Sequence, residues 1–149
     1  MPNIHANTDL KEKGAYTLTN IEAKCLGIHQ EHGAPFVVLK YFDSSHQCFS
    51  TWSKESLSSF TSFIDKLNNV TWNDIYKSAP KGLNGKKTGF GYTVHKDKSV
   101  LPNQIIVDKL SEDVTFFELR VSKKARVHGF RAKSAFFLIW LDQDHEVYK

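Results

Sequence analysis

Cysteine is scarce in this chain of 149 residues, which has only Cys25 and Cys48. The two form neither a CxxC pair nor a zinc-finger spacing, and small secreted scaffolds usually carry more cysteines. We therefore expect reduced thiols in a cytoplasmic protein, in preference to a disulfide. The polar start of the chain contains no apolar signal-peptide core, and no apolar run approaches the roughly 20 residues of a membrane span. These absences predict a soluble protein without a membrane partner.

Several catalytic signatures are missing as well. The GxSxG, HExxH and Cys–His nucleophile patterns do not occur. The stretch GLNGKKT at 82–88 has the wrong spacing for a phosphate-binding loop, and no apolar strand precedes it. The net charge of +4 permits an acidic partner such as nucleic acid but does not require one. We predict neither a metal nor a cofactor.

The length and the globular composition predict a single domain, 1–149. Residues 1–14 are polar and without a period, which favours a flexible lead-in. Strand-forming segments follow at 16–28, at 35–42 and, as a short return strand, at 46–52. This part of the chain therefore predicts two or three antiparallel strands.

Two helices are expected next. Ser53 can cap the first of them, and Asn68-Asn69 can end it. Thr71 and Asp74 fit a shortened capping box at the start of a second, short helix. The apolar residues expected to face the core are spaced three or four apart: Leu57, Phe60, Phe63, Ile64 and Leu67 in the first helix, Trp72 and Ile75 in the second.

The middle of the chain is irregular in pattern. Residues 79–103 are rich in Gly and Lys and predict a long basic loop, with room for a short strand at 92–95. Residues 104–110 fit a strand or a helical turn equally well. From Phe116, three apolar runs at 116–121, 126–130 and 135–141 are separated by polar turns, which predicts a β-meander. The expected fold class is α+β, an antiparallel sheet whose C-terminal three-stranded meander packs against one or two helices.

Strand alternation divides the polar residues of the meander between two faces. Arg126 and His128 share one face of their strand, and Glu118 and Arg120 share the polar face of the strand before it. This polar side is either a platform for an anionic ligand or the ordinary solvent side of a half-exposed sheet. Gly129 favours the functional interpretation, because glycine inside a strand indicates a bulge or a close backbone approach.

The end of the chain, WLDQDHEVYK, supports a second hypothesis. Asp142 and Asp144 could orient or charge the imidazole of His145, and Tyr148 could add a phenol to the same site. The alternative is a plain turn with an exposed His145 and with the Tyr148 ring packed on the sheet. The two residues can join a site only if the end of the chain folds back over the second strand of the meander.

The element order from Phe36 onward, with basic, His and Tyr residues late in the chain, resembles the RelE/ParE-type toxins of bacterial toxin–antitoxin pairs. The pattern RVHGFR…FFLIWLDxDHxVY is also similar to small uncharacterised proteins of phages and mobile elements. The toxin resemblance implies a metal-independent endoribonuclease that cuts messenger RNA. Its partners would be RNA or the ribosome, together with an antitoxin or another protein partner.

On this resemblance Arg126 and Arg131 would hold the phosphate, His128 or His145 would transfer protons, and Tyr148 would assist. The residues expected to bind the nucleic-acid backbone are Arg120, Lys123, Lys124, Lys133, Lys86 and Lys87. The alternative function is a noncatalytic nucleic-acid- or protein-binding module, such as a phage or mobile-element defence or counter-defence protein.

Overall fold

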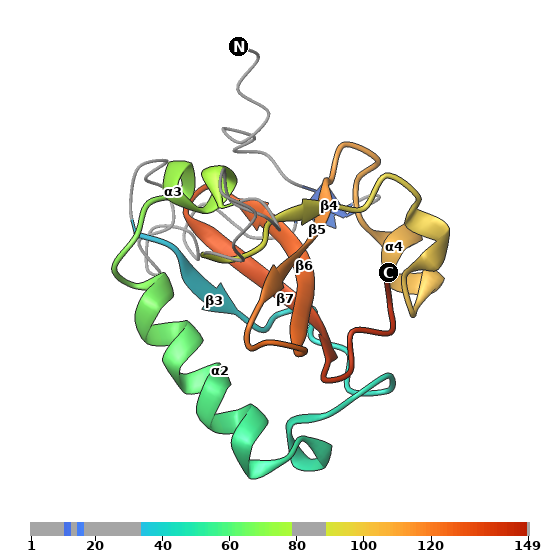
Figure 1. Ribbon diagram of the computed structural model, residues 1–149. Helices are drawn as coiled ribbons and strands as arrows, with labels where there is room; N and C mark the ends of the chain where they lie inside the picture. Colours follow the sequence, from blue (N-terminus) through green and yellow to red (C-terminus); the bar gives the residue numbers. More distant parts are fainter. Residues whose placement is uncertain (1–10, 13–14, 17–33, 79–88, 149) are drawn as a thin grey trace.

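A computed structural model describes residues 11–12, 15–16, 34–78 and 89–148 of the chain. Within them, five strands form one mixed sheet in the order β3-β7-β6-β5-β4, accompanied by three α-helices (Figure 1). The strands are β3 (Phe36–Val38), β4 (Thr93–Val94), β5 (Phe116–Arg120), β6 (Arg126–Ala132) and β7 (Ala135–Asp142). The helices are α2 (Lys54–Leu67), α3 (Trp72–Lys77) and α4 (Gln104–Lys109). The α+β class predicted from the sequence is confirmed.

The meander is also confirmed. Strands β5, β6 and β7 pair antiparallel in chain order. The short strand expected at 92–95 is present as β4, and it joins the free edge of β5, a pairing that the sequence does not predict. Strand β3 differs from the prediction, because it pairs parallel with β7. Parallel neighbours need a long crossover. Here the chain between β3 and β7 supplies it, since that stretch contains all three helices.

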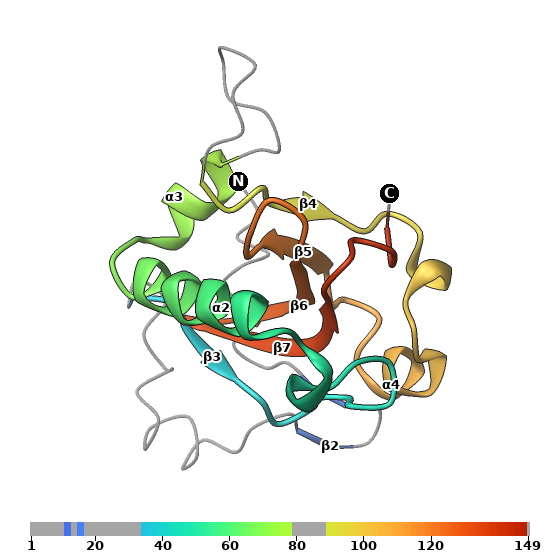
Figure 2. The ribbon, with the colours of Figure 1, turned by 60° about the horizontal axis from the view of Figure 1, so that its bottom comes forward.

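Both predicted helices begin and pack as their sequences indicate. The Ser53 hydroxyl accepts a hydrogen bond from the Ser56 N–H at 3.1 Å, and Thr71 and Asp74 form a reciprocal capping box. The apolar stripe of α2 and the ring of Trp72 cover one face of the sheet, which Figure 2 shows with α2 running across it. The sheet residues beneath them are Phe117, Leu119, Val127, Phe136, Leu138 and Leu141.

Residues 46–52 do not form the predicted strand. They contain a turn followed by the 3-10 helix η2 (Phe49–Thr51). The reason lies in Asp43, whose carboxylate accepts hydrogen bonds from the Ser45 N–H at 2.9 Å and from the Trp140 indole at 3.0 Å. These bonds close a turn and tie it to β7, so the chain leaves the sheet after β3.

Other predictions have mixed outcomes. Residues 104–110, which the sequence leaves undecided, form α4, and the 3-10 helix η3 (Lys98–Val100) precedes it. The lead-in predicted for 1–14 lies outside the described residues except for β1 (Lys11–Glu12), which pairs antiparallel with β2 (Ala15–Tyr16). Most of the strand predicted at 16–28 lies outside the described residues, as do Cys25 and 79–88. Cys48 is a free thiol.

The second face of the sheet is covered too, contrary to the half-exposed sheet considered above. Tyr41, Leu101, Leu110 and Val114 pack on it, with α4 and Val147 beside them. The polar residues of this face are therefore enclosed: Glu118 is 3% exposed, Arg126 5% and His128 0%. No helix among the described residues has the length and apolar character needed to cross a membrane.

Candidate acid–base site at the end of the meander

A β-bulge in β7 determines the face of the sheet on which Asp142 lies. His128 pairs with Trp140 but Gly129 pairs with Leu138, so Ile139 is an extra residue on β7. Beyond the bulge, Asp142 lies on the same face as Arg126 and His128. A Cβ at position 129 would collide with the carbonyl of Phe137, so the close approach requires glycine. The prediction that Gly129 marks a bulge or a close backbone approach is confirmed, with the extra residue on the neighbouring strand.

Two histidines and an aspartate form a buried hydrogen-bonded chain. His128 Nε2 lies 3.0 Å from Asp142 Oδ2, and His128 Nδ1 lies 2.8 Å from His95 Nε2. Burial raises the pKa of Asp142, but hydrogen bonds from His128 and from backbone N–H groups outweigh this effect and lower it to about 2. Burial lowers the pKa of His95 to about 3 and also lowers that of His128.

These pKa values fix the direction of the hydrogen bonds. The ionised Asp142 only accepts, so His128 donates from Nε2 and is left with a lone pair on Nδ1. His95 then donates from Nε2 to that lone pair. Both ring nitrogens of the buried His128 are occupied, so this residue positions its neighbours and is enclosed away from a substrate.

A second group of polar residues surrounds Glu118. Its Oε2 lies 3.3 Å from Arg126 Nε and 3.2 Å from His145 Nε2. Burial raises the pKa of Glu118 to about 7 in spite of the neighbouring Arg126 charge. A carboxyl with a pKa close to neutrality can give or take a proton at physiological pH. His145, with a side chain 32% exposed, connects this carboxyl to solvent.

The chain end folds back as the sequence hypothesis requires. Asp142 accepts hydrogen bonds from the backbone N–H groups of Glu146 at 2.8 Å and Val147 at 3.0 Å. This turn includes His145 in a left-handed conformation, with φ of 56°. It also places the Tyr148 ring 5.0 Å from the ring of His95. We call His95, Glu118, Arg126, His128, Asp142 and His145 the polar cluster.

Other predicted site residues lie elsewhere. Arg131 is on the opposite face, where its guanidinium stacks 4.8 Å from the Trp72 ring and donates to the Tyr76 hydroxyl at 2.8 Å. Lys133 lies in the β6–β7 turn, at the end of the meander away from the polar cluster. The exposed Lys124 pairs with Asp144 at 3.2 Å. The structure therefore does not bring Arg131 and Lys133 to the polar cluster.

Four other residues were predicted to bind the nucleic-acid backbone, and the structure describes two of them. Arg120 and Lys123 line a cavity beside the end of α2. Lys86 and Lys87 lie outside the described residues.

Sequence reasoning missed two members of the polar cluster as site residues. Strand alternation could have identified Glu118, because it places this residue on the polar face of β5, opposite His128. His95 comes from the segment read as a basic loop, and its contact with His128 depends on β4 pairing with β5. Predicting that pairing from two residues of strand was not feasible.

Three members of the polar cluster offer ligand atoms that a metal ion could use. One ligand atom each of His95, Glu118 and His128 lies within 4.8 Å of the other two. Two histidines and one carboxylate are a donor set that suits zinc. His95 Nε2 and His128 Nδ1 bond to each other and Glu118 Oε2 contacts Arg126, whereas His95 Nδ1 and Glu118 Oε1 are buried without a hydrogen-bond partner among the described residues. Metal dependence is therefore part of the functional test below.

Comparisons with known proteins found no matching family model, no matching curated protein and no matching solved structure.

Proposed function

We propose that this protein binds RNA and cleaves it by metal-independent acid–base chemistry at the polar cluster. The observation that carries the proposal is the contact between a half-exposed imidazole, His145, and a buried carboxyl, Glu118, beside the buried Arg126. Such a pair can exchange a proton with a substrate and share the resulting charge with the protein interior. The proposal agrees with what the resemblance to RelE/ParE-type toxins implies.

The reaction follows from the chemistry of RNA. His145 takes the proton of a ribose 2′-hydroxyl, and the 2′-oxygen attacks the adjacent phosphorus. The bond from phosphorus to the 5′-oxygen breaks, which gives a 2′,3′-cyclic phosphate and a 5′-hydroxyl. We assign protonation of the leaving oxygen to Tyr148, whose ring lies 5.0 Å from that of His95. Glu118 holds His145 and stabilises its protonated form.

The experiment compares RNA cleavage by the wild type with that by His145→Gln and Glu118→Gln. His46→Gln is the matched control, because His46 is an exposed histidine in the turn after β3. The assay uses single-stranded RNA with and without ribosomes, and each reaction is run with and without EDTA. We expect both cluster variants to lose about 100-fold or more in rate, the control to keep it, and EDTA to have no effect.

Two results would count against the proposal. Equal cleavage by the wild type and both cluster variants would show that the acid–base assignment is wrong. Loss of cleavage in EDTA, restored by zinc, would replace it with metal chemistry at His95, Glu118 and His128.

A second candidate function is a noncatalytic binding module. The observation that favours it is that Arg126 and His128 are buried and already bound, Arg126 also donating to the Ser122 carbonyl at 3.1 Å. On this alternative the polar cluster only stabilises the end of the meander. RNA binding without cleavage under every condition above would support this alternative.

A further inference from the structure

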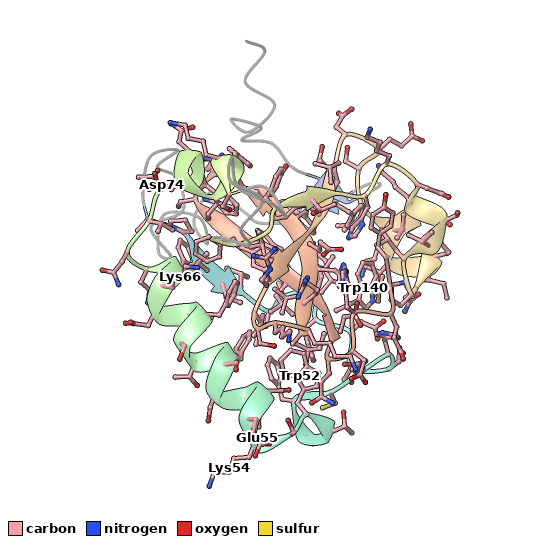
Figure 3. The ribbon with its side chains drawn as sticks, viewed as in Figure 1. Trp52, Lys54, Glu55, Lys66, Asp74 and Trp140 are labelled. Atoms are coloured by element: carbon pink, nitrogen blue, oxygen red, sulfur yellow. The ribbon has the colours of Figure 1, made fainter. Side chains whose placement is uncertain are left out.

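A cavity of about 410 Å³ lies between the last turns of α2 and the β5–β6 turn. Its lining includes Phe63 and Lys66 from α2, and Arg120 and Lys123 from the meander side. Figure 3 shows Lys66 at the C-terminal end of α2 and Lys54 at the opposite end. The volume falls within the range of small-ligand sites.

The charged side chains that line the cavity are all positive. Lys66, Arg120 and Lys123 contribute cations, and no acidic residue is among the described residues of its wall. The Lys66 ammonium lies 4.6 Å from the centre of the Phe90 ring. Burial and the charge of Arg120 lower the pKa of Lys66, and burial and the charge of Arg126 lower that of Arg120. An anion in the cavity would relieve this mutual repulsion.

The backbone holds Arg120 at the boundary between the cavity and the polar cluster. Gly91 has a φ of 58°, and a Cβ there would lie 2.9 Å from an Arg120 guanidinium nitrogen. Arg120 therefore packs directly on the Gly91 backbone. On β5 it lies two residues beyond Glu118, about 7 Å along the strand, and it pairs across the ladder with Arg126.

The cavity supplies solvent-accessible cations, which the polar cluster lacks. Arg126 is buried and bound to Glu118, so it is poorly placed to hold the backbone of a large anion. The cavity offers cations that solvent reaches, since Lys66 and Lys123 are exposed. Arg120, in the cavity wall, also interacts electrostatically with Glu118, so this residue links the cavity to the polar cluster.

From these contacts we infer that the cavity binds a backbone phosphate of single-stranded RNA next to the phosphodiester that is cleaved. The inference rests on the proposed function for the choice of RNA as the anion. Lys66 and Lys123 make the ionic contacts, and Arg120 sets the position of the phosphate relative to Glu118.

The test measures binding without cleavage. The probe is a short fluorescein-labelled single-stranded RNA with 2′-O-methyl riboses, which cannot be cut, and anisotropy is recorded between about 50 and 200 mM KCl. Lys66→Glu and Lys123→Glu should each weaken binding about fivefold or more and reduce the salt slope. Lys54→Glu, which makes the same charge change at the other end of α2, should stay within about twofold of the wild type.

The outcomes separate this inference from the proposed function. Wild-type affinity in both cavity variants, or an equal loss in Lys54→Glu, would overturn the cavity site whether or not RNA is cleaved. If the cavity variants bind the probe weakly and the wild type cleaves no RNA, the phosphate site in the cavity is supported and the proposed nuclease activity is wrong.

The source of the phosphate also needs a test. Inorganic phosphate alone should raise the melting temperature much less than the RNA probe does. If the free ion gives the same increase, and Lys66→Glu abolishes it, the cavity is a site for free phosphate and the RNA assignment is wrong.

Discussion

The pKa of Glu118 leads to a prediction about stability that does not depend on any activity. Burial raises this pKa from 4.5 to about 7. The carboxyl therefore ionises more easily in the unfolded chain than in the folded one. Its contribution to stability is present at low pH and is lost as the pH rises from about 4.5 to about 7. The difference between the two pKa values, about 2.5, corresponds to about 3 kcal/mol of unfolding free energy.

Glu118→Gln removes this titration while keeping the shape of the side chain. His95 and His128 contribute in the opposite direction over part of the same pH range, because burial lowers their pKa values. The two histidines are present in both proteins, so their contributions largely cancel in the difference between them. The unfolding free energy of the variant minus that of the wild type should therefore rise by about 3 kcal/mol between about pH 4 and about pH 8.

Urea denaturation followed by circular dichroism at several pH values measures this difference. Glu112→Gln is the matched control, since Glu112 is exposed, and its curve should run parallel to that of the wild type. Arg126 keeps its hydrogen bonds to the Ser122 and Ala125 carbonyls in the Glu118→Gln variant. The loss of unfolding free energy that does not depend on pH should therefore be small. Parallel curves for Glu118→Gln and the wild type would refute the pKa assignment.

Three further predictions concern the surroundings of the polar cluster. Gly129→Ala should lower the unfolding free energy by about 3 kcal/mol in thermal denaturation, because the new Cβ collides with the backbone of β7. Asp142 has its pKa lowered from 3.8 to about 2, so its contribution of about 2 kcal/mol is present above about pH 4 and is lost as the pH falls towards 2. Asp142→Asn should remove that dependence and speed hydrogen exchange at the amides of Glu146 and Val147. Arg131→Gln should cost about 1 kcal/mol through its lost aromatic contacts and leave any RNA cleavage unchanged.

The helices were the most predictable part of the fold. Their caps are local interactions, since Ser53 bonds to an amide three residues on, and the same holds for Thr71. The apolar spacing of α2 fixes which side packs inward, so the sequence predicts its buried face correctly. Strand β3 was harder, because its partner β7 is about a hundred residues away and only the fold decides that they run parallel.

The polar cluster was only partly predictable, and the reason is the bulge. Alternation correctly places Arg126 and His128 on one face of β6. In β7 the run AFFLIWL is apolar throughout, so no polar residue marks which face each position takes. Ile139 adds one residue to that strand, and this reverses the face on which Asp142 lies. The contact between Asp142 and His128 depends on that reversal.

The burial of the polar cluster is relevant to whether its residues do more than stabilise the fold. Glu118 Oε1 and His95 Nδ1 are buried without a hydrogen-bond partner among the described residues, and each such group costs stability. At neutral pH the ionisation of Glu118 costs about 3 kcal/mol more. Well-packed apolar side chains would often hold such a sheet at least as well. The contact between a carboxyl of near-neutral pKa and the solvent-reaching His145 is the arrangement on which the proposed proton transfer depends.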